Sequence, residues 1–305
     1  MNKDIIIIGC GPSGITAAIY AKRAGFNPII IEKYMPGGKL PLAHKIDNYP
    51  GYTSIKGSDL ATSFIDSLNE NHIAIEFDEI IEISKEKDTF ILKGRYKTYS
   101  SNAVIVASGT SDKKLNIEGE KQFFGKGVST CAVCDGQFFK GKPMAVVGGN
   151  SKALEEAIYL SSLTDTVYVI NKLSSLDGDE ILVDKILSIP QIKVLNGTIP
   201  LKIEGERTVT SLEIENIDTH EKSTLSLNAI FVYVGSSSNS SFASFKDIFD
   251  EKGYIITNEK METTVDGLFA AGDCRSKYLR QIVTATSDGA IAALSAINYL
   301  KKLVE

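Results

Sequence analysis

The sequence lacks any apolar run long enough to cross a bilayer. Its longest runs, such as DIIIIGC at 4–10 and NPIIIEK at 27–33, are far shorter than the roughly 20 residues of a transmembrane helix. A strand-like run also begins within four residues of Met1, which leaves no room for a secretory signal peptide. We therefore expect a cytoplasmic protein without a membrane span.

Cysteine and histidine are scarce as well. The chain has 4 cysteines and 3 histidines, which excludes a disulfide framework. A structural zinc ion takes four ligands, but Cys131 and Cys134 form a single C-x-x-C pair and the histidines are dispersed. We therefore expect no metal, and the pair is either a buried structural pair or a dithiol that cycles between oxidised and reduced forms.

The remaining composition is that of an ordinary globular protein. Of the 305 residues, 43% are hydrophobic and 23% are charged, and the net charge is −5. This length suits two domains of ordinary size. The charge points to no particular partner, and we expect neither nucleic acid nor a membrane.

Residues 4–33 predict a complete βαβ unit, with a buried strand, a glycine turn, an amphipathic helix and a second buried strand. Gly9, Gly11 and Gly14 have the spacing of a dinucleotide-binding turn, in which glycine gives a tight turn, room for a pyrophosphate and close helix packing. Glu32 ends the second strand, where an acid hydrogen-bonds a ribose hydroxyl. The unit therefore predicts a dinucleotide site.

A second unit of the same kind begins at Pro143, with a strand over 143–147, a helix over 151–162 and a strand over 166–170. Polar stretches at 111–122 and 235–242 are interpreted as linkers. The last segment is too small for a core of its own, so we expect it to complete the first domain. The predicted fold class is α/β, with two Rossmann-like, three-layer ββα domains: 1–113 with 242–305, and 114–241 inserted.

With these motifs together, the chain resembles the low-molecular-weight thioredoxin reductases over nearly its whole length. The motifs include GCGPSG, PGGKL, IDNYPG, CAVCDG, EEAIYL, GLFAAGD and YLRQIVTATSDG. The resemblance implies FAD, a homodimer, and a redox disulfide between Cys131 and Cys134 that passes electrons to thioredoxin, with Cys134 nearer the flavin. Lys39 departs from the glutamine that the family usually has. Matched position by position, the implied flavin-binding residues are Gly9, Gly11, Pro12, Ser13, Gly14, Glu32, Gly38, Leu40, Asn48, Gly109, Gly272, Asp273, Arg280 and Gln281.

Asp135 directly follows the cysteine pair and has two interpretations. In the family it supplies and takes the proton that thiol and thiolate exchange, as a general acid and base must. Alternatively, it only caps the helix. We interpret Cys10 and Cys274, by contrast, as small residues that fill tight turns.

The second glycine turn has lost the residues that bind a dinucleotide phosphate. Asn150 replaces the second glycine of GGNSKA, where its side chain obstructs a phosphate, although asparagine can adopt a left-handed conformation. The family has His-Arg-Arg and a later arginine at the next strand end, but this chain has Asn171, Lys172, Leu173 and Asp177. Lysine does not replace the guanidinium fork, and Asp177 would repel a phosphate.

These departures predict a reductant other than NAD(P)H. The ferredoxin-dependent flavin thioredoxin reductases lack the same motifs, and we expect the chain to be most like them, with reduced ferredoxin as donor. Surface lysines that would meet an acidic ferredoxin are Lys113, Lys114, Lys140 and Lys142. Three alternatives stay open: an NAD(P)H-dependent reductase with a degenerate site, a diflavin-linked disulfide oxidoreductase, and a non-enzymatic flavoprotein that senses redox state.

Overall fold

The computed structural model describes residues 4–43, 46 and 48–303, and for Cys134 the backbone alone. The chain divides into two compact units. Unit 1 combines Met1–Ser111 with Ser237–Glu305, and unit 2 is Asp112–Ser236.

Unit 1 is built on a five-stranded sheet in the order β18-β7-β1-β2-β3, whose strands are all parallel. Most of these strands are buried along their whole length, as expected for a parallel sheet that is covered on both faces. The N-terminal βαβ prediction is confirmed. The strands are β1 (Ile5–Ile8), β2 (Pro28–Glu32), β3 (Ala74–Phe77), β7 (Ala103–Val106) and β18 (Leu268–Ala270).

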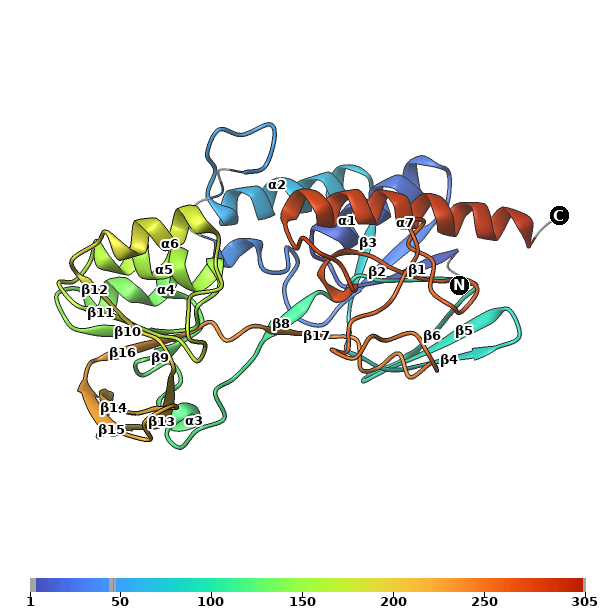
Figure 1. Ribbon diagram of the computed structural model, residues 1–305. Helices are drawn as coiled ribbons and strands as arrows, with labels where there is room; N and C mark the ends of the chain where they lie inside the picture. Colours follow the sequence, from blue (N-terminus) through green and yellow to red (C-terminus); the bar gives the residue numbers. More distant parts are fainter. Residues whose placement is uncertain (1–3, 44–45, 47, 304–305) are drawn as a thin grey trace. The chain divides into compact units, whose positions relative to one another are not determined.

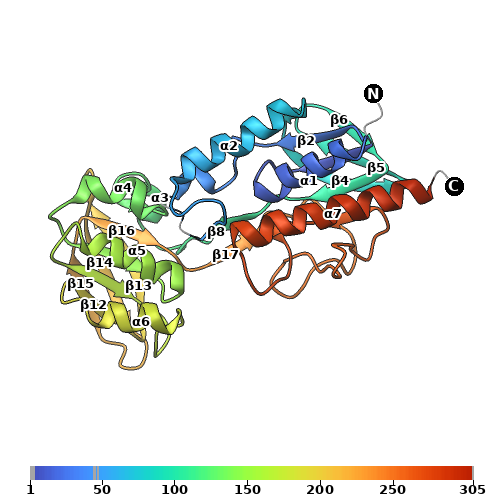
Figure 2. The same ribbon diagram turned by 90° about the horizontal axis from the view of Figure 1, so that it is seen from above.

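Helices cover one face of this sheet and an antiparallel sheet lies on the other (Figure 1). The helices are α1 (Pro12–Arg23), α2 (Gly57–Glu70) and α7 (Ile282–Lys302), and α1 lies between α2 and α7 (Figure 2). Ile5 and Ile7 pack toward the helices, and Ile6 toward the antiparallel strands, because successive side chains of a strand alternate between its faces. The antiparallel strands are β4 (Ile80–Glu86), β5 (Thr89–Gly94) and β6 (Thr98–Ser101).

Unit 2 repeats this arrangement around a second parallel sheet, in the order β12-β11-β10-β16-β9. Its strands are β9 (Val128–Ser129), β10 (Met144–Val147), β11 (Val167–Ile170), β12 (Ile192–Leu195) and β16 (Ala229–Val232). Helices α4 (Ala132–Asp135), α5 (Ser151–Ser161) and α6 (Glu180–Leu187) pack on one side, and β13 (Thr198–Gly205), β14 (Val209–Asn216) and β15 (Lys222–Ser226) on the other. The predicted fold class, two three-layer dinucleotide-binding-type domains, is confirmed.

The two segments interpreted as linkers hold some regular structure, and the two units divide within them, between Ser111 and Asp112 and between Ser236 and Ser237. β8 (Thr110–Asp112) and β17 (Ser236–Ser238) form a two-stranded sheet, and α3 spans Glu120–Phe123. Both strands are short and polar, and each pairs with a segment distant in the sequence, so no local periodicity reveals them. Within the described residues, no helix has the length and apolarity that crossing a membrane requires.

Candidate functional site

The predicted site residues of unit 1 gather at the carboxyl ends of four neighbouring strands. Gly9 follows β1, Glu32 ends β2, Gly109 lies shortly after β7, and Gly272 lies just after β18. Parallel strands present these ends at one edge of the sheet, where open α/β sheets bind ligands. A cavity of about 460 Å³ is lined there by Gly9 and Glu32 among others.

The first glycine turn leaves its helix open for a ligand. Gly9 has φ +104°, and a Cβ atom there would lie 2.4 Å from the Ala107 carbonyl oxygen, so glycine is required. Gly11 is the N-cap of α1 and offers no side chain to the free N–H groups of the first turn. Gly38 lies so close to Gly11 that a Cβ atom on Gly38 would be 3.1 Å from the Gly11 Cα. The turn is therefore a backbone cradle in which phosphate oxygens fit.

Glu32 is held at the rim of the cradle by two main-chain groups. Its Oε2 accepts the N–H of Cys10 at 2.7 Å, and its Oε1 accepts the N–H of Tyr34 at 2.8 Å. Each carboxylate oxygen has a second lone pair, so Glu32 retains the capacity to accept ribose hydroxyl groups.

Asp273 has an oxygen that the protein itself does not satisfy. Within the described residues, Asp273 Oδ1 is buried without a hydrogen-bond partner. Burial raises the pKa of Asp273 above its usual value, although Lys277, Arg280 and Lys39 oppose this rise. A buried polar atom without a partner is rare in native proteins, so a hydrogen-bond donor from a ligand fits this position.

Arg280 and Gln281 connect the start of α7 to the rest of the site. Arg280 Nε donates to the Asp273 carbonyl oxygen at 3.2 Å, and its guanidinium lies 4.0 Å from the centre of the Tyr254 ring. Gln281 Oε1 accepts from Asn48 Nδ2 at 3.1 Å, which brings together the motifs IDNYPG and YLRQIVTATSDG.

The other predicted residues lie in the same unit. Pro12, Ser13 and Gly14 open α1, and the buried Leu40 begins the 3-10 helix η1 (Leu40–Leu42). Ser13 lies so close to the turn after β18 that a Cβ atom on Gly272 would lie 2.5 Å from its Oγ.

Asp288 also belongs to this site, although it is not among the predicted site residues. Its Oδ2 accepts the Gly272 N–H at 3.0 Å and pairs with Lys277 at 2.7 Å, while its Oδ1 pairs with Arg275 at 3.0 Å. The Asp288 and Lys277 side chains are only 9% exposed. Asp288 thus fixes the turn that carries Asp273. In the sequence, only the position of Asp288 within the motif TSDG could have indicated this role.

In unit 2, the cysteine pair follows β9 at the edge of the sheet. Cys131 is disulfide-bonded, whereas Cys10 and Cys274 are free and buried. The side chain of Cys134 lies outside the described residues, so the predicted pairing stays a prediction.

The surroundings of these cysteines separate two kinds of thiol. Burial raises the pKa of Cys10 to about 12 and that of Cys274 to about 11, which keeps both as unreactive thiols.

Asp135 ends α4, and its side chain makes no capping hydrogen bond to the 3-10 helix η2 (Gly136–Phe139) that follows. The interpretation of Asp135 as a helix cap therefore receives no support.

The second glycine turn differs from the first at its N-cap. Asn150 caps α5, where its Oδ1 accepts the N–H of Ala153 at 3.1 Å and its Nδ2 donates to the carbonyl oxygen of Tyr233 at 2.8 Å. Its φ is −77°, so Asn150 does not use the left-handed conformation that is open to asparagine: an N-cap prefers extended backbone, from which its side chain reaches the helix. The Ala153 N–H, one of the groups at the start of α5 that could bind a phosphate, therefore already donates to the Asn150 side chain.

The loop after β11 places acidic and amide oxygens over the same turn. A Cβ atom on Gly149 would lie 2.5 Å from Asn171 Oδ1 and 3.1 Å from Asp177 Oδ1. The Asp177 N–H donates to the Gly149 carbonyl oxygen at 3.1 Å, and the Asp179 N–H to Ser151 Oγ at 3.0 Å. A cavity of about 470 Å³ remains beside this turn. Gly149 there faces the Asp177 carboxylate, at the position where the family has an arginine.

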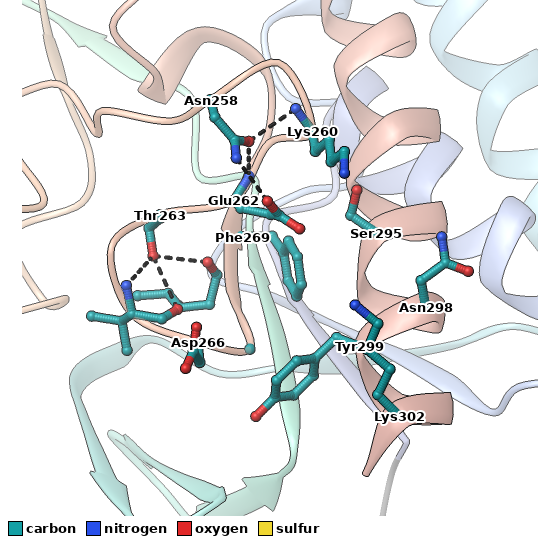
Figure 3. Close-up of a pocket in the computed structure, with 13 residues that line it drawn as sticks. Asn258, Lys260, Glu262, Thr263, Asp266, Phe269, Ser295, Asn298, Tyr299 and Lys302 are labelled. Carbon is teal, nitrogen blue, oxygen red and sulfur yellow. Dashed lines mark hydrogen bonds between the residues drawn. The ribbon is translucent and has the colours of Figure 1, made fainter. Parts of the chain in front are cut away.

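A third cavity, of about 670 Å³, lies in unit 1 between the segment 258–269 and the last turns of α7 (Figure 3). Asn258 Oδ1 accepts the N–H groups of Lys260 and Glu262, and Asn258 Nδ2 donates to Glu262 Oε2 at 2.7 Å. Its lining includes none of the predicted site residues.

Sequence and structure comparisons place the chain among known proteins. Residues 3–289 match the family described as pyridine nucleotide-disulphide oxidoreductase. The thioredoxin reductase of Bacillus subtilis is 39% identical over 99% of this chain and 96% of its own length. The chain belongs to this family of disulfide oxidoreductases, in its thioredoxin reductase group. The expected FAD is its cofactor, and the backbone cradle and the unsatisfied Asp273 oxygen fit that cofactor.

The solved structures do not support the prediction that the chain is most like the ferredoxin-dependent flavin thioredoxin reductases. A thioredoxin reductase from Lactococcus lactis has a TM-score of 0.93 and 34% identity, covering 99% of this chain and 100% of its own. A ferredoxin-flavin thioredoxin reductase from Clostridium acetobutylicum has a TM-score of 0.56 and 31% identity, covering 100% of this chain and 99% of its own. The electron donor must therefore be argued from the site.

Proposed function

We propose that the chain reduces thioredoxin through FAD and a Cys131–Cys134 disulfide, and that reduced ferredoxin, not NADPH, supplies the electrons. The observation that carries the choice of donor is the second glycine turn, where Asn150 caps α5 and the Asp177 carboxylate lies over Gly149. Both features oppose a bound pyrophosphate, one by occupying an N–H donor and the other by charge repulsion.

The proposed flavin site uses the residues at the carboxyl edge of the unit 1 sheet. The N–H groups at the start of α1 would hold the pyrophosphate, Glu32 a ribose, and Asp273 a polar group of the cofactor. Bound FAD accepts electrons singly and passes them on in pairs, which suits a one-electron donor and a disulfide acceptor. The other flavin-binding residues that the family resemblance implies remain predictions.

In unit 2, the chain supplies two thiols and a carboxylate. Reduction of the Cys131 disulfide requires two electrons and protonation of at least one sulfur, and Asp135 is the adjacent group that would donate and later accept this proton. The dithiol then attacks the thioredoxin disulfide through a mixed disulfide and returns to the oxidised state.

This electron flow is downhill. Low-potential ferredoxins have reduction potentials of about −400 mV, and thioredoxin has a reduction potential of about −270 mV. A difference of roughly 130 mV over two electrons corresponds to about 6 kcal/mol. The candidate docking residues Lys113, Lys114, Lys140 and Lys142 are all exposed in unit 2. Such lysines would attract an acidic ferredoxin.

We also propose that the protein works as a homodimer, as the family resemblance implies.

NAD(P)H remains the second candidate donor, because a specific observation favours it. The family model that matches residues 3–289 is described as pyridine nucleotide-disulphide oxidoreductase, and the cavity beside the second glycine turn persists. Turnover of thioredoxin with NADPH at a rate equal to that with reduced ferredoxin would favour this alternative.

The reaction is tested by replacing the groups assigned to it. Cys134→Ser is expected to abolish thioredoxin reduction, and Asp135→Asn to slow it by roughly 10²-fold or more. Asp165→Asn is a matched control, because Asp165 is exposed in the same unit and outside the site. Full activity of the Cys134→Ser enzyme would overturn the mechanism.

A further inference from the structure

Tyr233 stands between the altered glycine turn and the disulfide. It follows β16 directly, and its N–H donates to the Val147 carbonyl oxygen at 2.8 Å. Its own carbonyl oxygen accepts Asn150 Nδ2 at 2.8 Å, and a Cβ atom on Gly148 would lie only 2.5 Å from that oxygen. The Tyr233 main chain is therefore fixed against the turn from two sides.

The other end of Tyr233 reaches the cysteine pair. Its hydroxyl oxygen accepts the N–H of Ala132 at 2.9 Å, and Ala132 is completely buried and directly follows Cys131. The Cys131 N–H donates to Ser129 Oγ at 3.0 Å. Because the first N–H groups of a helix have no partner within it, these two hydroxyl groups hold the main chain on both sides of the Cys131 Cα.

The Tyr233 hydroxyl keeps this role over the whole working range of pH. Burial raises the pKa of Tyr233 above its usual value, and the charges of Glu156, Asp112 and Asp135 raise it further, while the hydrogen bond from Ala132 opposes the shift only in part. The phenol therefore stays neutral.

We propose that Asn150 and Tyr233 are positioning residues for the Cys131 disulfide: Asn150 fixes the Tyr233 main chain, and the Tyr233 hydroxyl fixes the peptide that joins Cys131 to Ala132. The same asparagine that occupies the phosphate position thus supports the disulfide. The inference rests on the proposed function only in that it takes this disulfide to be the one that cycles.

The consequence is a change in the disulfide equilibrium. The Tyr233–Ala132 contact is observed with Cys131 oxidised. The positioning role requires this contact to weaken when the disulfide is reduced, so its loss favours the dithiol. We expect Tyr233→Phe to raise the equilibrium constant for reduction by dithiothreitol about three- to tenfold, the larger value corresponding to about 30 mV. Asn150→Gly, which restores glycine to the turn, shifts it in the same direction by a smaller factor, about two- to threefold. The double variant shifts less than the product of both effects, because the two residues act in series.

The experiment equilibrates the FAD-loaded protein anaerobically with mixtures of reduced and oxidised dithiothreitol. One protein disulfide and one dithiothreitol dithiol exchange for one protein dithiol and one cyclic disulfide, so electrons and protons balance. Acid quenching, alkylation and mass spectrometry then give the fraction of protein dithiol. Tyr168→Phe is the matched control, because Tyr168 lies on β11 of the same sheet and is expected to leave the constant unchanged.

Two results would overturn the proposal: Tyr233→Phe and Asn150→Gly constants within twofold of the parent, or an equal shift in Tyr168→Phe. If Tyr233→Phe fails to fold, Asn150→Gly decides alone. The equilibrium involves no ferredoxin, NADPH or thioredoxin, so a wrong donor assignment leaves this outcome untouched. A parent protein without a reducible disulfide would instead contradict the proposed function as well.

Discussion

Replacing Asp288 by asparagine should destabilise unit 1 and weaken its hold on FAD. The Asp288 carboxylate is paired with Lys277 and Arg275, whose side chains are 9% and 11% exposed. Asparagine keeps an oxygen for the Gly272 N–H but leaves two largely buried cations without their counter-ion. Breaking a buried pair in this way costs about 3–5 kcal/mol.

The effect is measured as a shift in the urea midpoint for flavin release, which reports on unit 1 alone. With a slope of about 2–3 kcal/mol/M for a domain of this size, the midpoint should fall by about 1–2.5 M. Adding Lys277→Met to Asp288→Asn should recover part of the loss, because one unpaired cation is removed. Asp266→Asn, at an exposed position of the same unit, is the control and should stay within about 0.5 kcal/mol. A midpoint for Asp288→Asn equal to that of the control would show that the Asp288 ion pairs do not stabilise unit 1.

Three further predictions concern thiols, pH and the donor. In the native oxidised protein, Cys10 and Cys274 should resist iodoacetamide at pH 8, because burial raises the pKa of each to about 12 and about 11; rapid labelling seen by mass spectrometry would contradict this. Burial acts to raise the pKa of Asp78, but hydrogen bonds from Tyr99 and three backbone N–H groups outweigh it and lower that pKa below the ordinary value. The stabilisation by Asp78 is therefore present above the unfolded pKa of about 3.9 and lost as pH falls through the folded pKa. Asp78→Asn should lower the urea midpoint at pH 7 and progressively less below about pH 4, and an equal loss at both would argue against this linkage. Combining Asn150→Gly with Asp177→Arg should increase the rate of flavin bleaching by NADPH at least tenfold in stopped-flow absorbance, and an unchanged rate would show that these residues do not control the donor.

The first dinucleotide site was predictable because its requirements are local. Gly9, Gly11 and Glu32 lie within one βαβ unit, so the spacing of a strand, a turn and a helix sets their positions. The chemistry of the second turn was equally visible in Asn150 and Asp177. That the Asp177 carboxylate lies against Gly149 was not, because it depends on how the loop after β11 folds back.

Contacts between distant segments stayed hidden for a different reason. Asp288 meets Lys277 and Arg275 only because α7 packs behind the turn after β18. Tyr233 meets Ala132 because β16 and β9 are neighbours in the sheet although they are far apart in the sequence. Strand order is a property of the whole fold, and no local pattern encodes it.

Anaerobic bleaching of the flavin distinguishes reduced ferredoxin from NAD(P)H as the electron donor of this protein. The FAD-loaded protein is mixed with equal reducing equivalents of NADPH, NADH or enzymatically reduced ferredoxin, and its visible flavin absorbance is followed. We expect rapid bleaching by ferredoxin and slow or no bleaching by either nucleotide. Rapid bleaching by NADPH would contradict this expectation, and would mean that the capped turn at Asn150 and the carboxylate of Asp177 still admit a dinucleotide.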